Sequence, residues 1–286
     1  MAEPNLTPVD LRHQGYDGVV GVYTLETPDG PALFDCGPAT CYERLRAQVE
    51  VGELRHLLLS HIHLDHAGAA GLLVRGNPRI QVHVSEIGLP HVIDPTRLIA
   101  SARRVYGNAL DTLFGEPAPV PAENVHAAGH RELGLVCFPT PGHASHHVGY
   151  LDDEGTLYAG DACGVRLLPA RQVLPHAPPP DVDLEGWERT FEEILRHQPE
   201  RLALIHFGVV EGLEDVAEHV ERCRDYLRVW SGRVERGMDQ DEFVRCARHD
   251  YELSEGTYDE RVPYAAEFKD SWLGLERYWR KQRDVS

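Results

Sequence analysis

The sequence predicts a layered α/β fold, and three features of the chain indicate it. Short apolar runs alternate with helical stretches through the first third of the chain, which is typical of strands and helices packed in layers. Further short strands, separated by Gly and Asp turns, follow in the middle of the chain. Histidine and aspartate residues follow several of these strands directly, so we expect a functional site at one edge of a sheet.

The first half of the chain supplies the strand and helix alternation. Each strand is a short apolar run bounded by turn residues, and the first helix carries Leu45 and Val49 on one face. The expected elements are strands at 18–25 and 32–35, a helix at 42–51, a strand at 56–59, a helix beginning at 67 and a strand at 79–84.

The second half is expected to add an antiparallel group of strands and then helices. A helix is expected at 99–113, in a stretch of the kind that commonly covers a site but that the sequence alone does not place, and the proline-rich stretch 169–180 must be an irregular loop. Residues after 208 show helical spacing of apolar and aromatic side chains, which indicates a packing surface or a homodimer contact. The remaining expected elements are strands at 135–138, 148–151 and 156–159, a helix at 184–196 begun by Asp183, and a strand at 201–205.

Composition excludes several classes of partner. With 286 residues the chain can bury a full core, and its 42% hydrophobic and 26% charged residues are ordinary for a globular protein. A formal charge of −18 disfavours nucleic acid, which binds clustered Lys and Arg. No apolar run is long enough to span a membrane, and residues 1–5 lack the features of a signal peptide. The six scattered cysteines suit reduced thiols, so we expect a cytoplasmic protein.

The densest signal in the chain is a group of three histidines and one aspartate directly after the strand at 56–59. His61, His63, Asp65 and His66 fall within six positions on a strand-to-helix turn, where they cannot all face a core. Neutral imidazole and carboxylate suit zinc, iron and similar divalent metals. His61 and His63 alternate and can hold one ion, while Asp65 and His66 lie on the next turn and can hold a second.

Three later residues share this placement at the end of an apolar strand. His143 follows the strand at 135–138, and Asp161 follows the strand at 156–159. His206 follows the strand at 201–205. Because site residues are commonly carried at strand ends, where the scaffold is rigid and the loops are free, these three are expected to complete the metal site.

With these residues the chain resembles the metallo-β-lactamase-fold superfamily. The resemblance rests on the His-x-His-x-Asp-His motif at 61–66 and on Pro-Gly-His, Gly-Asp and His-x-Gly elements in the family's order. It covers roughly residues 18–208 and implies an αββα sandwich with a dinuclear metal centre. On this basis we expect a catalytic domain at 1–208 and a helical extension at 209–286 packed on it.

The resemblance also implies a role for each candidate ligand. The first metal is assigned His61, His63 and His143, the second Asp65, His66 and His206, and Asp161 bridges the two. Asp35, in an Asp-x-Gly turn, and His147 are implied as residues that support the ligands, although capping that turn explains Asp35 equally simply. The neighbouring His146 is expected to be exposed. Two divalent ions are implied, with zinc as the first choice and iron or manganese as alternatives.

A dinuclear centre predicts a hydrolytic mechanism. A water between two dications becomes hydroxide near neutral pH, and the same metals polarise a substrate carbonyl or phosphoryl oxygen. Asp65 is expected to orient this water and to shuttle its proton. A bridging Asp161 is the pattern of the general hydrolases of the family rather than of its zinc β-lactamases. His63 stands where the oxygen-reducing diiron flavoproteins often carry Glu.

Candidates for substrate contact are fewer. Arg166 and Arg171 lie in the loop expected to overhang the metals and could pair with a substrate carboxylate, with surface solvation as the alternative. Either residues 86–130 or the loop 165–183 is expected to form the lid. Tyr106 and Phe114 could line a pocket or pack in the core. The remaining histidines show no ligand spacing and receive no role: His13, His56, His91, His126, His130, His176, His197, His219 and His249.

The sequence thus predicts a dinuclear metal-dependent hydrolase of a small ester, thioester or lactone. An iron-dependent oxidoreductase of the same fold, similar to a persulfide dioxygenase or an oxygen-binding diiron protein, is the alternative. A metal-stabilised binding or sensing protein without turnover is a third. In each case the expected partner is a small molecule, with neither nucleic acid nor membrane, and the C-terminal helices could form a homodimer.

Overall fold

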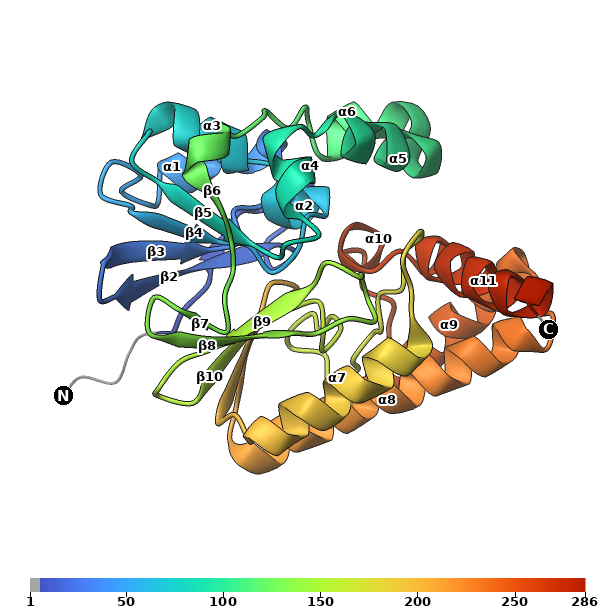
Figure 1. The fold of residues 1–286 in the computed structure, drawn as a ribbon. Helices are drawn as coiled ribbons and strands as arrows, with labels where there is room; N and C mark the ends of the chain where they lie inside the picture. The colour runs from blue at the N-terminus through green and yellow to red at the C-terminus, as the bar shows by residue number, and fades with distance from the viewer. Residues whose placement is uncertain (1–5, 286) are drawn as a thin grey trace.

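Two six-stranded sheets lie face to face in the computed structural model, which describes residues 6–285. Helices cover the outer face of each sheet, which gives the αββα sandwich that the sequence predicted (Figure 1). Residues 1–5, on which the expectation of no signal peptide rested, lie outside the described residues.

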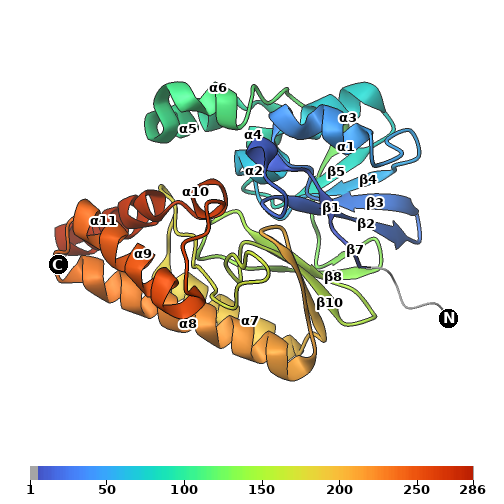
Figure 2. The ribbon, with the colours of Figure 1, turned by 180° about the vertical axis from the view of Figure 1, so that it is seen from behind.

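The first sheet has the strand order β1-β2-β3-β4-β5-β6. Its strands are β1 Val9–Asp10, β2 Gly21–Thr27, β3 Gly30–Phe34, β4 His56–Leu58, β5 Gln81–Val84 and β6 Val125–Ala127. The strands from β3 to β6 are parallel, and the antiparallel pairs β1–β2 and β2–β3 complete one side, seen from behind in Figure 2. The carboxyl ends of β3, β4 and β5 therefore meet at one edge.

The second sheet has the order β12-β11-β10-β9-β8-β7. Its strands are β7 Arg131–Glu132, β8 Leu135–Pro139, β9 Val148–Leu151, β10 Thr156–Gly160, β11 Arg201–Leu204 and β12 Gly208–Glu211. Strands β8, β9 and β10 pair antiparallel as expected, and β10 pairs parallel with β11. Because β8, β10 and β11 run in the same direction, their carboxyl ends also lie at a common edge.

The helices divide between the two halves of the sandwich. The first half carries α1 Tyr42–Arg46, α2 Leu64–Ala67, α3 Ala70–Gly76, α4 Leu89–Ile93, α5 Thr96–Tyr106 and α6 Leu110–Leu113. The second half carries α7 Leu184–His197, α8 Leu213–Glu235, α9 Gln240–Glu255, α10 Val262–Ala265 and α11 Phe268–Val285. Helices α5 and α6 extend past the first sheet on the same side of the molecule as α11 (Figures 1 and 2).

Aromatic side chains fill the space between the sheets. Phe34 of the first sheet packs against Tyr150 and Tyr158 of the second, with ring centroids 6.0 and 5.3 Å apart. Tyr23 of β2 is fully buried, and its hydroxyl bonds the carbonyl oxygens of Leu204 and Gly208, both at 2.9 Å. The hydroxyl of Tyr23 therefore joins the first sheet to the ends of β11 and β12.

Several elements differ from the sequence prediction. The helix expected at 42–51 ends at Arg46, because the backbone tightens into turns there, although Leu45 and Val49 are both buried as expected. The helix expected at 99–113 is interrupted at Gly107, whose positive φ of 53° breaks it into α5 and α6. Short 3₁₀ helices, which were not predicted, are also present at His13–Gly15, Ala39–Cys41, Gly107–Ala109 and Ala122–Asn124.

Four strands were not predicted. Strands β1, β6 and β7 contain only two or three residues each, too few to show a periodic pattern. Strand β12 follows directly after β11 and pairs with it, where the sequence indicated only helix. The second sheet therefore continues three residues past the expected domain boundary at residue 208, and the division into two folding units stays a prediction.

Two simpler expectations concern thiols and membranes. All six cysteines are free, and five of them are buried. Within residues 6–285, no helix combines the length and the apolar character that crossing a bilayer requires.

We predict that Tyr23→Phe lowers the free energy of unfolding by about 1–3 kcal/mol, because it removes a hydroxyl that bonds two buried carbonyl oxygens of the other sheet. Chemical denaturation measures this difference. Tyr42→Phe is the matched control, since the half-buried Tyr42 hydroxyl makes no hydrogen bond within residues 6–285. Equal stability of the two variants would contradict a role for the Tyr23 hydroxyl in joining the sheets.

Candidate metal centre

The seven predicted ligands lie together where the strand ends of the two sheets meet. His61, His63, Asp65 and His66 come from the turn after β4 and from α2. His143, Asp161 and His206 follow β8, β10 and β11. Their ligand atoms form groups in which every atom lies within 4.8 Å of the others. The structure therefore brings together residues that are up to 145 positions apart in the chain, from 61 to 206.

The first group is His61, His63 and His143. Nε2 of His143 lies 3.2 Å from Nε2 of His61 and 2.9 Å from Nδ1 of His63. Nitrogen ligands at about 2.0–2.1 Å from a tetrahedral zinc ion are about 3.3 Å apart. These three nitrogens therefore have the spacing of ligands that share one ion.

The second group is Asp65, His66 and His206. Oδ2 of Asp65 lies 3.4 Å from Nε2 of His206 and 3.9 Å from Nε2 of His66. Asp161 lies between the two groups: its Oδ1 is 3.3 Å from Nε2 of His66, and its Oδ2 is 3.6 Å from Nε2 of His143. One oxygen of Asp161 faces each group, which is the arrangement expected of a bridging carboxylate.

Unpaired polar atoms show that this cage fits metal ions. Nε2 of His66, Nε2 of His206 and Oδ1 of Asp161 are buried and have no hydrogen-bond partner. Leaving such atoms without a partner is costly, so buried polar atoms are nearly always satisfied. Imidazole nitrogens and carboxylate oxygens that converge on one space are satisfied together by a divalent cation.

Four of the five cage imidazoles, those of His61, His66, His143 and His206, are oriented through Nδ1. Nδ1 of His143 donates to the carbonyl oxygen of His176, and Nδ1 of His206 donates to that of Val19, both at 2.7 Å. Nδ1 of His61 lies 3.0 Å from the Ser60 hydroxyl. When Nδ1 carries the proton in this way, Nε2 presents its lone pair to the centre of the cage.

Asp35 orients His66 in the same manner. Its carboxylate accepts from Nδ1 of His66 at 2.8 Å and from the backbone and hydroxyl of Ser60, both at 2.7 Å. Asp35 is fully buried and adopts a positive φ of 52°, which Asp tolerates better than most residues. The side chain therefore bonds a ligand directly and does more than cap its turn.

His147 supports the bridging aspartate. The backbone N–H of Asp161 donates to Nε2 of His147 at 3.1 Å, and Nδ1 of His147 bonds the hydroxyl of Thr140 at 2.7 Å. Gly160 makes this approach possible, because a Cβ there would lie 2.6 Å from Nε2 of His147. His147 therefore acts on the position of Asp161, and its ring nitrogens are both occupied.

Helix α7 holds the loop that carries His143. The backbone N–H of Asp183 donates to the carbonyl oxygen of Gly142, while the side chain of Asp183 caps α7 by accepting from Gly186. Gly142 has a φ of +135°, and a Cβ there would lie 2.3 Å from Trp187. The indole of Trp187 donates to the carbonyl oxygen of Ala162 at 2.7 Å, so one side chain braces the loops of both His143 and Asp161.

The protein environment shifts the pKa values of the two groups in opposite directions. Burial lowers the pKa of His61 and His63 well below 6.5 and that of His143 to about 4. Burial also acts to lower the pKa of His66 and His206, but Asp161 and Asp65 outweigh it and raise both. Without metal, the second group is therefore held together by carboxylate–imidazolium attraction.

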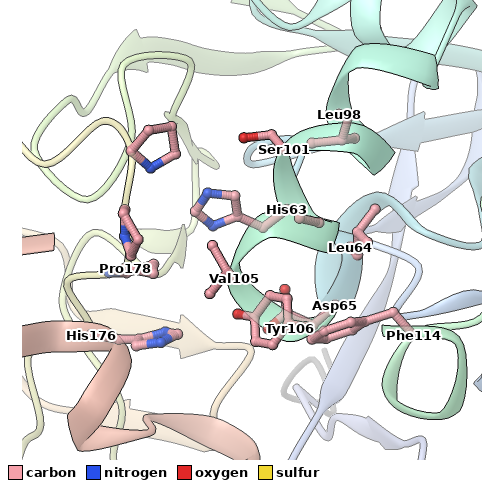
Figure 3. Close-up of a pocket in the computed structure, with 13 residues that line it drawn as sticks. His63, Leu64, Asp65, Leu98, Ser101, Val105, Tyr106, Phe114, His176 and Pro178 are labelled. Carbon is pink, nitrogen blue, oxygen red and sulfur yellow. The ribbon is translucent and has the colours of Figure 1, made fainter. Parts of the chain in front are cut away.

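A pocket opens beside the cage and reaches His63 and Asp65 (Figure 3). One wall is formed by α5 and the residues after it, and the facing wall by the loop before α7. Its lining is largely apolar and consists, besides the ligands, of Leu64, Leu98, Ser101, Ala102, Val105, Tyr106, Phe114, His176 and Pro178–Pro180. Both segments proposed as the lid therefore contribute to the pocket, and Tyr106 and Phe114 line it.

Arg166 and Arg171 lie elsewhere. They line a separate cavity together with Val209, Glu218 and Arg222, and Nε of Arg166 donates to the carbonyl oxygen of Ala170 at 3.1 Å. The backbone of Arg166 pairs with that of His206 and Phe207, but neither arginine side chain lines the pocket beside the cage. We therefore do not include either arginine among the residues that contact substrate at the metal centre.

Two histidines were misjudged from the sequence. His146 was expected to be exposed but is buried, because its ring stacks on that of His61 with centroids 6.0 Å apart. His176 received no role, yet its Nδ1 lies 3.7 Å from Oδ2 of Asp161, and with His143 and Asp161 it forms a further group of potential ligands. No spacing motif marks His176, which stands alone in a proline-rich loop.

The αββα sandwich, with a histidine–aspartate cage at its edge that could hold metal ions, has the arrangement of the metallo-β-lactamase type. The family model of the metallo-beta-lactamase superfamily matches residues 15–206, which is more than half of the chain. The chain belongs to this superfamily.

Several known proteins are similar to this chain in sequence or in fold. The metallo-beta-lactamase fold-containing protein ST1585 of Sulfurisphaera tokodaii is 25% identical over 197 residues, which cover 59% of this chain and 71% of that protein. The structure of TTHA1429 from Thermus thermophilus aligns over 97% of this chain and 93% of its own with a TM-score of 0.66, at 18% identity. TTHA1623, solved in a di-iron-bound form, aligns over 70% of this chain and 93% of its own with a TM-score of 0.55, at 27% identity.

We predict that Asp35→Asn weakens metal binding by about 10–100-fold, because the amide cannot replace the negative charge that orients His66. Asn also tolerates the positive φ at this position, which limits the effect on the fold. Competition with a chelator of known affinity measures the change. Asp29→Asn in the exposed β2–β3 turn is the control and should bind metal as the wild type does.

As the pH falls, we expect the second group (Asp65, His66 and His206) to lose its metal before the first group (His61, His63 and His143). A raised pKa means that His66 and His206 still bind protons near neutral pH, so protons compete with metal there first as the pH falls. His143, with a pKa of about 4, competes only at lower pH. Dialysis at about pH 5 should leave the first group loaded and strip the second, as measured by metal content. Simultaneous loss of all metal would contradict this order.

Proposed function

We propose that the protein is a metal-dependent hydrolase of a small, uncharged ester, thioester or lactone. The carrying observation is a cage of two ligand groups, with Asp161 between them, that opens into an apolar pocket. The proposed cofactors are two divalent ions, with zinc first and iron or manganese as alternatives. Bound there, they would supply hydroxide from water near neutral pH and polarise the substrate carbonyl.

Asp65 is the cage residue best placed to handle protons. It lines the pocket beside His63, and 16% of its side chain is exposed, whereas Asp161 is almost fully buried. Burial would raise the pKa of Asp65, but His66 and His206 outweigh burial and keep it below its ordinary value. An ionised Asp65 at the pocket can accept a hydrogen bond from the attacking water and orient it toward the carbonyl carbon.

The pocket lining supports an uncharged substrate with an apolar group. Leu98, Val105, Phe114 and Pro178–Pro180 offer hydrocarbon surface of the kind that binds acyl chains or rings. The described residues that line it include neither Lys nor Arg. A carboxylate or phosphate on the substrate would have no cation to pair with outside the metal cage, so these substrates are disfavoured.

A second candidate is an iron-dependent oxidoreductase. It is supported by TTHA1623, which was solved in a di-iron-bound form and is 27% identical to this chain. Imidazole and carboxylate ligands suit iron as well as zinc, so the cage itself does not separate the two functions. Metal identity after purification without chelators, together with oxygen consumption, distinguishes them.

We expect the metal-loaded protein to hydrolyse at least one member of a panel of lactones, thioesters and aryl esters. Chelation should abolish turnover and added zinc, manganese or iron should restore it, because the nucleophile depends on metal. Within a matched pair, p-nitrophenyl butyrate should be cleaved at least about 10-fold faster than the p-nitrophenyl half-ester of succinate, since the pocket lacks a cation. Absence of turnover across the panel with both metals bound would refute the proposal.

A further inference from the structure

His176 is the one pocket histidine outside the seven-residue cage. Its ring lines the pocket opposite α5, as Figure 3 shows, and lies 5.7 Å from the ring of His143. The residue is buried, and its Nδ1 has no hydrogen-bond partner. The distance of 3.7 Å to Oδ2 of Asp161 is too long for a hydrogen bond. A buried ring nitrogen without a partner, beside the cage and the pocket, indicates a group that a ligand completes.

The metal cage does not require this ring. Each of the two ligand groups already has three residues, and Asp161 serves both. The main chain of His176 has a separate task, since its carbonyl oxygen accepts from Nδ1 of His143. The side chain is therefore left on the pocket side, within reach of a molecule that also reaches His63 and Asp65.

Helix α11 fixes the position of His176. The hydroxyl of the fully buried Ser271 accepts from the N–H of Ala177 at 3.2 Å and donates to the carbonyl oxygen of Pro175 at 3.4 Å. One serine thus holds the residues on both sides of His176. Gly274, one turn further on, lets the helix touch the loop, because a Cβ there would lie 2.0 Å from the carbonyl oxygen of Ala177.

The same helix also approaches the opposite wall of the pocket. Asp270, directly before Ser271, is buried near Tyr106 on α5, and burial together with the Asp270 carboxylate raises the pKa of Tyr106. Asp270 is also close enough to His176 for the two to interact electrostatically. The C-terminal helix therefore lies near both His176 and Tyr106, two of the polar side chains that line the pocket.

We propose that His176 is a catalytic residue that contacts the substrate and donates a hydrogen bond to the substrate oxygen on which negative charge develops, with Ser271 and Gly274 of α11 as its positioning residues. The role rests on the proposed hydrolase function. An N–H held in place beside a developing oxyanion stabilises it without reorganisation in the transition state, and removal of one such donor typically costs about 10²–10³-fold in kcat.

The decisive variants are His176→Ala and His176→Gln, with the exposed His130→Ala as the control. We expect His176→Ala to lower kcat by about 10²–10³-fold with KM changed only a few-fold, and the amide N–H of Gln to restore part of the loss. Metal content should stay at the wild-type value. Loss of one metal equivalent would show that His176 is a ligand, and unchanged kcat would show that it does not act; either result overturns the proposal.

A binding measurement separates this proposal from the hydrolase assignment. Acetohydroxamate, which carries an anionic oxygen and binds metals, is titrated into the metal-loaded wild type and His176→Ala by calorimetry. We expect about 10-fold weaker binding to the variant, even if no substrate of the panel is cleaved. Equal affinity at equal metal content overturns the role of His176, whereas weaker binding without turnover overturns only the hydrolase.

Ser271→Ala tests the positioning by α11. It removes both hydrogen bonds to the His176 loop without adding volume, so kcat and acetohydroxamate affinity should fall in the same direction as in His176→Ala, but less. Thermal unfolding shows whether the variant is folded. If Ser271→Ala does not fold, the kcat and acetohydroxamate affinity of a stable His176→Gln protein still test the role of His176. Wild-type kcat and affinity in a folded Ser271→Ala protein would overturn the assigned role of the helix.

Discussion

The structure depends on the burial of polar atoms that face one another at the junction of two sheets. His61, His66, His143, Asp161 and His206 are almost completely buried, although imidazole and carboxylate groups are costly to remove from water. Their outward-facing atoms are satisfied by the protein, whereas inward-facing atoms of His66, Asp161 and His206 are not. Because buried polar atoms without partners are costly, a metal ion that completed them would also stabilise the fold.

This constraint explains why the surroundings of the cage are so fully bonded. Asp35, Ser60 and two backbone carbonyl oxygens each orient one ring, and His147 holds the backbone of Asp161. Each hydrogen bond fixes which nitrogen carries the proton, so the lone pairs converge. The pKa values divide accordingly: burial lowers the pKa of His61 in the first group, whereas Asp161 and Asp65 outweigh burial and raise the pKa of His66 and His206 in the second.

The residues that line the pocket beside the cage all lie within residues 15–206, the part of the chain that the superfamily match covers. Helix α5 and Phe114 form one wall, and the proline-rich loop forms the other. Helix α11, beyond the matched residues, bonds that loop through Ser271. The part of the chain shared with the superfamily therefore supplies both the cage and the pocket lining, and α11 braces the proline-rich loop, consistent with a fold that hosts many chemistries.

The sequence by itself determined the cage and the layered fold. His61, His63, Asp65 and His66 are close together in the chain, and His143, Asp161 and His206 each follow an apolar run, so local pattern was sufficient to find them. Only the tertiary structure decided the short strands β1, β6, β7 and β12, the burial of His146, the placement of Arg166 and Arg171 away from the pocket, and the position of His176. These features depend on which distant segment packs against each residue, and contacts of that kind leave no periodic trace in the chain itself.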